Sequence, residues 1–185
     1  MACIYGNISN IDTTGASQAT ANQDRLNIKG VEASKKLAET DLARMENYKC
    51  MIIKVGRAKQ MDPAVIAAII SRESRAGAAL QGEWGDHGNA FGLMQVDRRY
   101  HTPAGAWNSE QHIGQATDIL ISFTNEIRAK FPTWSQEQCF KGGISAYNAG
   151  VSTVSSYENI DAKTTGEDYS NDVVARAQWF RSKGY

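Results

Sequence analysis

The sequence has no excess of charge of either sign. Its 185 residues carry 20 Lys and Arg side chains against 20 Asp and Glu, so the formal net charge at pH 7 is +0. Proteins that bind nucleic acid through its phosphates are generally basic, and acidic solvating tails are strongly negative. The balance therefore argues against both, although it leaves room for a local patch.

Long hydrophobic runs are absent as well. The longest apolar run, from Ala64 to Ile70, is far shorter than the ~20 residues that cross a bilayer. The N-terminal residues show neither a basic n-region nor an apolar h-region, so no secretory signal is visible. We therefore expect no membrane association, and the sequence leaves the route of export open.

Cysteine and proline are scarce. The cysteines, Cys3, Cys50 and Cys139, are odd in number, and their spacing fits no zinc pattern. We expect Cys50 and Cys139, which lie in segments of helical periodicity, to be buried or half-buried thiols without a catalytic role. Because the chain has only 3 prolines and much alanine, it favours helices.

Apolar periodicity predicts where these helices lie within a single domain, residues 1–185. Residues 1–22, rich in Ser, Thr, Asn and Gly, are expected to form an extended or loosely packed arm. A helix that begins at Asp62-Pro63 is apolar almost all round and has Gly77 available to stop it, which is typical of a buried central helix. The other predicted helices cover residues 31–48, 49–59, 109–130, 135–147 and 170–182.

Residues 77–108 have no helical period. This glycine-rich stretch contains short strand-like pieces near residues 85–86, 90–91 and 95–97. The expected fold class is therefore mainly α (α+β), with helices around a buried central helix and a small β-hairpin region.

Three carboxylates frame the irregular stretch: Glu73, Asp86 and Asp97. Two carboxyl groups are the minimum for splitting a glycosidic bond, because one donates a proton and the other activates water or stabilises the cation. Glu73 follows an apolar helix, where desolvation can keep a carboxyl protonated, whereas the polar surroundings of Asp86 and Asp97 favour ionised groups. Alternatively, Glu73 is only a solvated partner of Arg72 and Arg75.

Two further motifs could line a cleft. Gln95, in the apolar turn at residues 91–96, can donate to and accept from a sugar acetamide. The Tyr147-Asn148 pair before Gly150 offers a flat ring and a polar ledge, although it could equally be a helix C-cap. The turn itself could be no more than a hydrophobic plug. The remaining candidates, His101 and Tyr169, are residue types that are more often structural.

The order of these motifs is more informative than any one of them. Ser71-Arg72-Glu73-Ser74, then Gly-Leu-Met-Gln at residues 92–95, then Ala-Tyr-Asn-Ala-Gly at residues 146–150 resemble the lysozyme-like superfamily of peptidoglycan-cleaving enzymes. Within it, residues 5–185 resemble goose-type (g-type) lysozymes. The resemblance implies a lysozyme-like fold, a monomer without metal or cofactor, and hydrolysis of the β-1,4 bond between N-acetylmuramic acid and N-acetylglucosamine.

By the same resemblance, Glu73 matches the general acid, and Asp86 and Asp97 match the acidic pair that holds or activates the attacking water. Inversion at the anomeric carbon, a role in antibacterial defence, and binding of peptidoglycan and N-acetylglucosamine oligomers are implied in the same way. The positions that match the glycan-binding cleft are Gln95, His101, Phe123, Tyr147, Asn148, Gly150 and Tyr169.

The cysteines depart from the pattern of the bird enzymes, which carry four cysteines in two disulfides. The chain is closer to disulfide-free, fish-like members, so a reducing compartment is compatible with it, while the resemblance implies an extracellular or lysosomal one. Two other functions stay open. A lytic transglycosylase shares the motifs but forms 1,6-anhydro products without an activated water, and a non-catalytic protein on this scaffold would only bind peptidoglycan.

Overall fold

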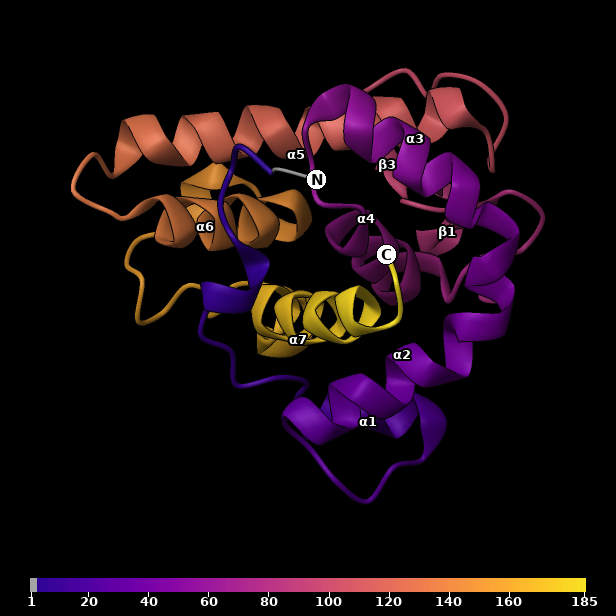
Figure 1. Ribbon diagram of the computed structural model, residues 1–185, viewed down its shortest axis with the longest axis horizontal. Coiled ribbons are helices and arrows are strands. Elements are labelled where there is room, and N and C mark those ends of the chain that lie inside the picture. Colours follow the sequence, from indigo (N-terminus) through magenta and orange to yellow (C-terminus); the bar gives the residue numbers. More distant parts are fainter. Residues whose placement is uncertain (1–2) are drawn as a thin grey trace.

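The computed structural model describes residues 3–185 and is mainly helical, with one small antiparallel sheet (Figure 1). This confirms the predicted fold class. The helices are α1 (Gln18–Ala21), α2 (Val31–Met45), α3 (Lys49–Lys59), α4 (Pro63–Ser74), α5 (Glu110–Lys130), α6 (Gln136–Ala149) and α7 (Tyr169–Ser182), and the strands are β1 (Trp84–Gly85), β2 (Ala90–Phe91) and β3 (Val96–Asp97).

Helix α4 is the buried centre of the molecule. Its residues from Pro63 to Ser71 are buried, as the all-round apolar sequence predicts. Asp62 caps its start by accepting a 2.9 Å hydrogen bond from the Ala64 N–H, and Pro63 occupies the first turn.

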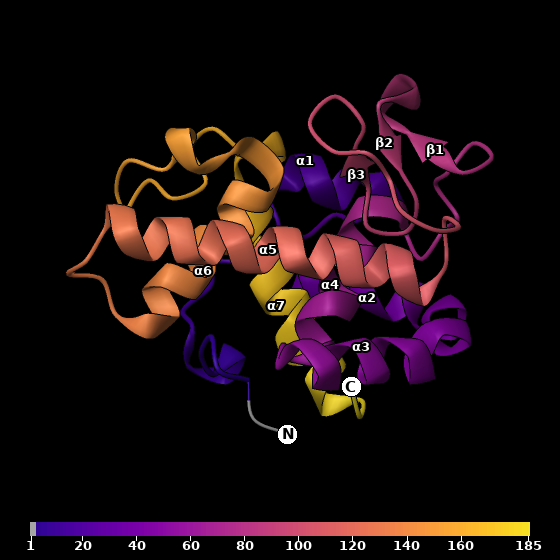
Figure 2. The ribbon, with the colours of Figure 1, turned by 90° about the horizontal axis from the view of Figure 1, so that it is seen from above.

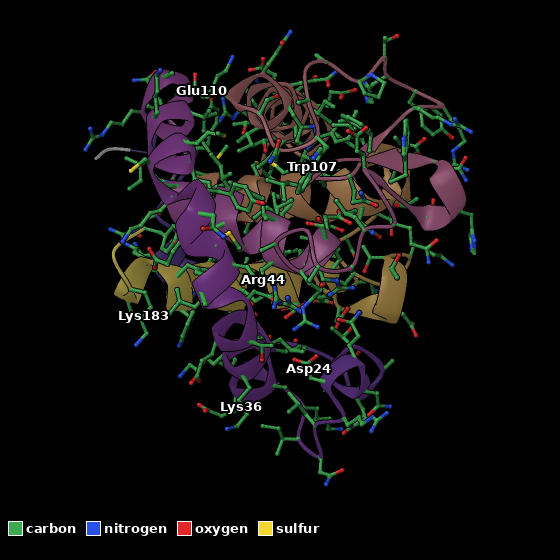
Figure 3. The ribbon with its side chains drawn as sticks, turned by 90° about the vertical axis from the view of Figure 1, so that its right-hand side faces the viewer. Asp24, Lys36, Arg44, Trp107, Glu110 and Lys183 are labelled. Atoms are coloured by element: carbon green, nitrogen blue, oxygen red, sulfur yellow. The ribbon has the colours of Figure 1, made fainter. Side chains whose placement is uncertain are left out.

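Helix α4 ends at Ser74, but its cap is not Gly77, the residue that the sequence made available to stop it. The left-handed cap is Arg75, with φ of 54°. A non-glycine residue holds this conformation only where its surroundings fix it. Here the Arg75 guanidinium lies 2.8 Å from Asp24 and 3.0 Å from Asp41, two residues that are distant in sequence. Arg44 donates to the Arg75 carbonyl at 3.0 Å. Figure 3 labels Arg44, on α2, and Asp24, from the N-terminal segment.

The other long helices pack around α4 in pairs. Helix α7 packs on α4, and α6 runs back along α5 after a short turn, so that α5 and α6 lie antiparallel (Figure 1). In Figure 2 the small sheet and the segment after α6 rise on the same side of α5. This arrangement places the C-terminal end of α4, the sheet and the end of α6 around one region.

The N-terminal segment is packed more closely than the expected loose arm. Ile8 is fully buried, Ile11 is almost so, and the Gln178 amide donates to both of their carbonyls at 3.0 Å. Ile8 and Ile11 are isolated among polar residues in the sequence, yet both pack into the hydrophobic core. Residues 1–2, the start of the expected arm, lie outside the described residues.

The sheet is a three-stranded meander in the order β1-β2-β3, with Trp84 opposite Phe91 and Ala90 opposite Asp97. Gly92, at φ of 79°, permits the tight turn after β2, because a Cβ there would meet the His112 ring at 2.6 Å. The Ser74 hydroxyl donates to the Leu93 carbonyl at 2.8 Å. The end of α4 is thereby tied to the β2–β3 turn.

All three thiols are free. Cys139 is buried and Cys3 is half-buried, but Cys50 is exposed, so the expectation for Cys50 was wrong. Cys50 is the second residue of α3 and lies on the solvent face of this helix, whose buried residues are Ile52, Val55 and Gly56. Over residues 3–185, no helix combines the length and the apolar character that crossing a membrane requires.

Candidate active site

Glu73 lies on the last turn of α4, with its side chain half-buried. One carboxyl oxygen accepts a 2.8 Å hydrogen bond from the Tyr169 hydroxyl. Burial raises the pKa of Glu73 to about 7, and the negative charge of Asp86 adds to this, while the Tyr169 hydroxyl and the Arg72 charge oppose it. Glu73 is therefore a carboxyl group that still holds its proton near neutral pH.

The neighbouring arginines do not pair with Glu73. Arg72 lies 3.0 Å from Asp168 and 2.8 Å from Asp172, and Arg75 turns to the other side of α4. Glu73 is therefore not a solvated ion-pair partner of Arg72 or Arg75, the alternative that the sequence left open.

Tyr169 is the first residue of α7 and is fully buried. The Arg72 guanidinium lies 5.1 Å from the centre of its ring. Burial and the charge of Glu73 raise the pKa of Tyr169 well above its ordinary value, so the phenol stays neutral and donates to Glu73. Tyr169 is therefore the hydrogen-bond partner of Glu73, and Arg72, which pairs with Asp168 and Asp172, lies against its ring.

Tyr147, near the end of α6, connects this region to the sheet. Its hydroxyl donates to the Met94 carbonyl at 2.7 Å, and the Met94 N–H donates to Nε2 of the buried His112 at 3.0 Å. Burial raises the pKa of Tyr147 well above its ordinary value, and the charge of Glu73 contributes. The ring is thus fixed beside Glu73 as a neutral group. We call Glu73, Tyr147 and Tyr169 the α4 side of the site.

Asp97 and Asp86 lie on the sheet. Asp97 ends β3, and Asp86 begins the 3-10 turn that follows β1. Asp86 and His87 have left-handed φ values of 48° and 55°, which is unusual for side-chain-bearing residues and common near functional groups.

Arg99 is the cation of this region. It lies 2.7 Å from Asp97 and 3.8 Å from Asp86, and its hydrogen bonds to Asp97 hold the pKa of that carboxyl below its ordinary value. We call Asp86, Asp97 and Arg99 the hairpin side. Asp97 is therefore in the opposite electrostatic situation to Glu73, because its pKa is lowered where that of Glu73 is raised.

A cleft of about 590 Å³ opens between the end of the sheet, the middle of α5 and the end of α6. It takes in most of the positions predicted from the sequence, but its lining does not include Glu73, Asp86 or Tyr169. Glu73 and Tyr169 are linked to it through Tyr147, and Asp86 through Arg99. The predicted residues that line it are Gln95, Asp97, His101, Phe123, Tyr147, Asn148 and Gly150.

Gln95 and Asn148, like Tyr147 and Asp97, have polar groups engaged within the protein. The Gln95 amide donates to the carbonyls of Ala90 at 3.3 Å and Gly92 at 2.9 Å, so its donor group holds the β2–β3 turn instead of pointing at a ligand. The Asn148 carbonyl oxygen accepts from the Thr165 N–H at 2.9 Å. Both residues shape the cleft by fixing backbone.

Among the cleft residues that sequence reasoning missed are Arg99 and Tyr100. Arg99 follows Asp97 by two positions, a spacing at which an arginine can fold back onto a carboxylate, so the local sequence contained that signal. Tyr100, 79% exposed on the same turn, gave none. Among residues 3–185, no group of three or more His, Cys, Asp or Glu side chains is placed to hold a metal ion.

Comparison with known proteins agrees with this geometry. The family model Lysozyme g matches residues 5–184. Lysozyme g of Cyprinus carpio is 74% identical over the whole of both chains. Lysozyme g of Struthio camelus is 59% identical over 98% of this chain and 89% of its own, and lysozyme g-like protein 2 of Homo sapiens is 41% identical over 98% and 82%. The chain belongs to the lysozyme g family of glycoside hydrolases.

Proposed function

We propose that this protein hydrolyses the β-1,4 bond between N-acetylmuramic acid and N-acetylglucosamine in peptidoglycan, with inversion at the anomeric carbon, and that it serves antibacterial defence. The observation that carries the proposal is the contrast between Glu73, whose pKa is raised, and Asp97 of the hairpin side, whose pKa is lowered. Two carboxyl groups with pKa values pushed apart are what general acid and water activation require.

Glu73 is the proton donor in this proposal. Its pKa of about 7 keeps it protonated at the start of the reaction and close enough to neutrality to transfer the proton to the leaving oxygen. The Tyr169 hydrogen bond stabilises the carboxylate that remains after transfer.

Asp86 and Asp97 hold the water that attacks the anomeric carbon. Both belong to the sheet, whereas Glu73 belongs to α4, so the acid and the water site come from separate elements. Inversion needs this division, because water must enter on the face opposite the leaving group.

The cleft binds the glycan chain. Phe123 and Tyr147 present aromatic rings to it, and His101 and the backbone at Gly150 lie along it. In this proposal Gln95 and Asn148 keep the cleft walls in shape, and Tyr169 acts through Glu73. The ligands are peptidoglycan and N-acetylglucosamine oligomers. We propose a monomer that binds neither nucleic acid nor membranes.

Product analysis tests the proposal. Purified peptidoglycan is digested, and the new chain ends are identified by mass spectrometry and by NMR of the fresh anomeric proton. We expect reducing ends that first appear as the α-anomer, and far less product from Glu73→Gln in the same time. 1,6-Anhydro ends would instead indicate a transglycosylase, a β-anomer would exclude inversion, and binding without products would indicate a recognition protein.

A further inference from the structure

The hairpin side contains two negative groups on separate segments. The Asp86 side chain is 57% exposed and the Asp97 side chain 30% exposed. Two carboxylates that share a site repel each other, and exposed side chains are free to turn apart. Something must hold them in place if they are to share one water.

Arg99 contacts both. Its Nε donates to Asp97 Oδ1 at 3.0 Å and its Nη2 to Oδ2 at 2.7 Å, which is a bidentate pair. The same Nη2 lies 3.8 Å from Asp86 Oδ2. The backbone N–H of Arg99 also donates to Asp97 Oδ1 at 2.9 Å, so the rotamer of Asp97 is fixed twice.

Other charged groups nearby do not take this role. His101 adds a weaker favourable charge toward Asp97, and Glu73, on α4, is an acidic group whose pKa the charge of Asp86 raises. Arg98, the adjacent residue, directs its guanidinium to the ring of Trp84, 5.4 Å from its centre. Within residues 3–185, Arg99 is the arginine or lysine found within ion-pair distance of Asp86 or Asp97.

We infer that Arg99 is a positioning residue for hydrolysis: its guanidinium holds Asp97 and Asp86 together as one pair that orients the attacking water. Each carboxylate oxygen has two lone pairs, and Asp97 Oδ2 accepts only one hydrogen bond from Arg99, so a water can still bind to that oxygen. The planar fork matters because a lysine supplies the charge without the two parallel hydrogen bonds. This inference rests on the proposed function.

The test compares two variants that remove the same charge from adjacent residues, Arg99→Gln and Arg98→Gln, with Arg99→Lys as the conservative change. Turnover of soluble peptidoglycan glycan fragments is measured across pH. For Arg99→Gln we expect kcat to fall about 10-fold to 100-fold, the scale at which a displaced reacting group costs rate, with KM nearly unchanged. Arg99→Lys should recover part of the loss, and Arg98→Gln should behave as wild type.

The pH profile supplies a readout that a structural role would not move. Arg99 lowers the pKa of Asp97, so its removal should shift the acid limb of kcat to higher pH. Because the Arg99 side chain is 55% exposed, the variants should keep the wild-type Tm, which shows that they fold.

A double-mutant cycle decides whether Arg99 acts through Asp97. In the Asp97→Asn background, Arg99→Gln should cause little further loss. Equal kcat values for Arg99→Gln and Arg98→Gln, or an undiminished effect of Arg99→Gln in Asp97→Asn, would overturn the inference alone. Full turnover in the double variant Asp86→Asn/Asp97→Asn would overturn the proposed water site, and the inference with it.

Discussion

The α4 side and the hairpin side carry the same chemical group in opposite environments. Glu73 is withdrawn from solvent, its pKa is raised to about 7, and its bonded partner is a neutral phenol. Asp97 lies partly in solvent, accepts three hydrogen bonds from one arginine and has a lowered pKa. Burial decides the first pKa and pairing decides the second.

The supports behind the two sides differ in the same way. Behind Glu73, the Arg72–Asp172 pair is almost completely buried, and Arg176 joins it with no exposed surface at all. The Arg99 pairs are open to water. Glu73 is therefore backed by a buried part of the core, whereas Asp97 and Asp86 pair with one exposed side chain.

The largest effect should come from removing the acid. Glu73→Gln keeps size and polarity but cannot donate the proton, so kcat should fall by about 10² to 10⁴, the usual contribution of general acid catalysis. Reducing-end release from peptidoglycan measures it. A matched control is Glu83→Gln, an exposed residue just before β1, which should retain activity. If Glu73→Gln were as active as Glu83→Gln, Glu73 would not be the proton donor, and the two sides would not differ in function.

The buried ion pairs of Asp172 with Arg72 and Arg176 should matter far more for stability than the exposed ion pairs of Arg99. Asp172 accepts from Ser34 and Arg176 and pairs with Arg72, so Asp172→Asn leaves buried arginines short of a counter-charge. We expect a loss of about 3 to 5 kcal/mol in the free energy of unfolding, measured by denaturant titration. Asp86→Asn, the control on the hairpin side, should show no measurable change. Similar losses in both variants would mean that exposure does not separate the two supports.

Glu73→Gln should also change how stability depends on pH. The ordinary pKa of the group is 4.5 and its folded pKa is about 7, so the unfolded wild-type chain releases this proton first as pH rises. Wild-type stability contributed by Glu73 is therefore lost between these two values, while glutamine has no proton to lose. The difference in Tm, variant minus wild type, should grow from about pH 4.5 to 7 and then level off. A constant difference would show that burial does not set this pKa.

Tyr169→Phe should sharpen the account of the acid. The phenol donates to the Glu73 carboxylate and lowers its pKa, so its removal should raise that pKa further. Glu73 then stays protonated to higher pH, and the alkaline limb of kcat should move up by about one pH unit. Tyr157→Phe, whose hydroxyl bonds to Asp12 away from the cleft, is the control. A limb that moves down would contradict the direction of this hydrogen bond.

The helices could be predicted well because their start signals are local. Asp62, Ser109 and Ser135 each cap a helix through a hydrogen bond from a backbone N–H within three residues, and the predicted helices begin at or beside these residues. The residue that caps the end of α4 was not predicted, because Arg75 is held in its left-handed conformation by Asp24 and Asp41, which come from much earlier in the chain.

In the site, too, local features could be predicted from the sequence and contacts between distant residues could not. The apolar helix before Glu73 was enough to predict a desolvated carboxyl, and the pKa of about 7 agrees with it. The partner of that carboxyl, Tyr169, is 96 residues away, and no local pattern relates the two. Gln95 was expected to face a ligand because amides bind amides, but the turn at Gly92 leaves carbonyls that its donor group satisfies.

The smallest effect concerns salt. With a formal net charge of +0, the protein has no long-range attraction to an anionic cell wall, so binding depends on contacts within the cleft. Between about 10 and 150 mM salt the Debye length falls from about 30 to about 8 Å, which weakens distant charges and barely touches buried ones. Wall lysis should therefore change little over this range, with any change arising from the exposed hairpin side. A charge-reversed variant, Glu126→Lys/Glu158→Lys, adds positive surface charge at two exposed residues outside the cleft lining and should acquire a steeper salt dependence than wild type. An equally steep fall in the wild type would instead reveal a basic patch that the balanced total conceals.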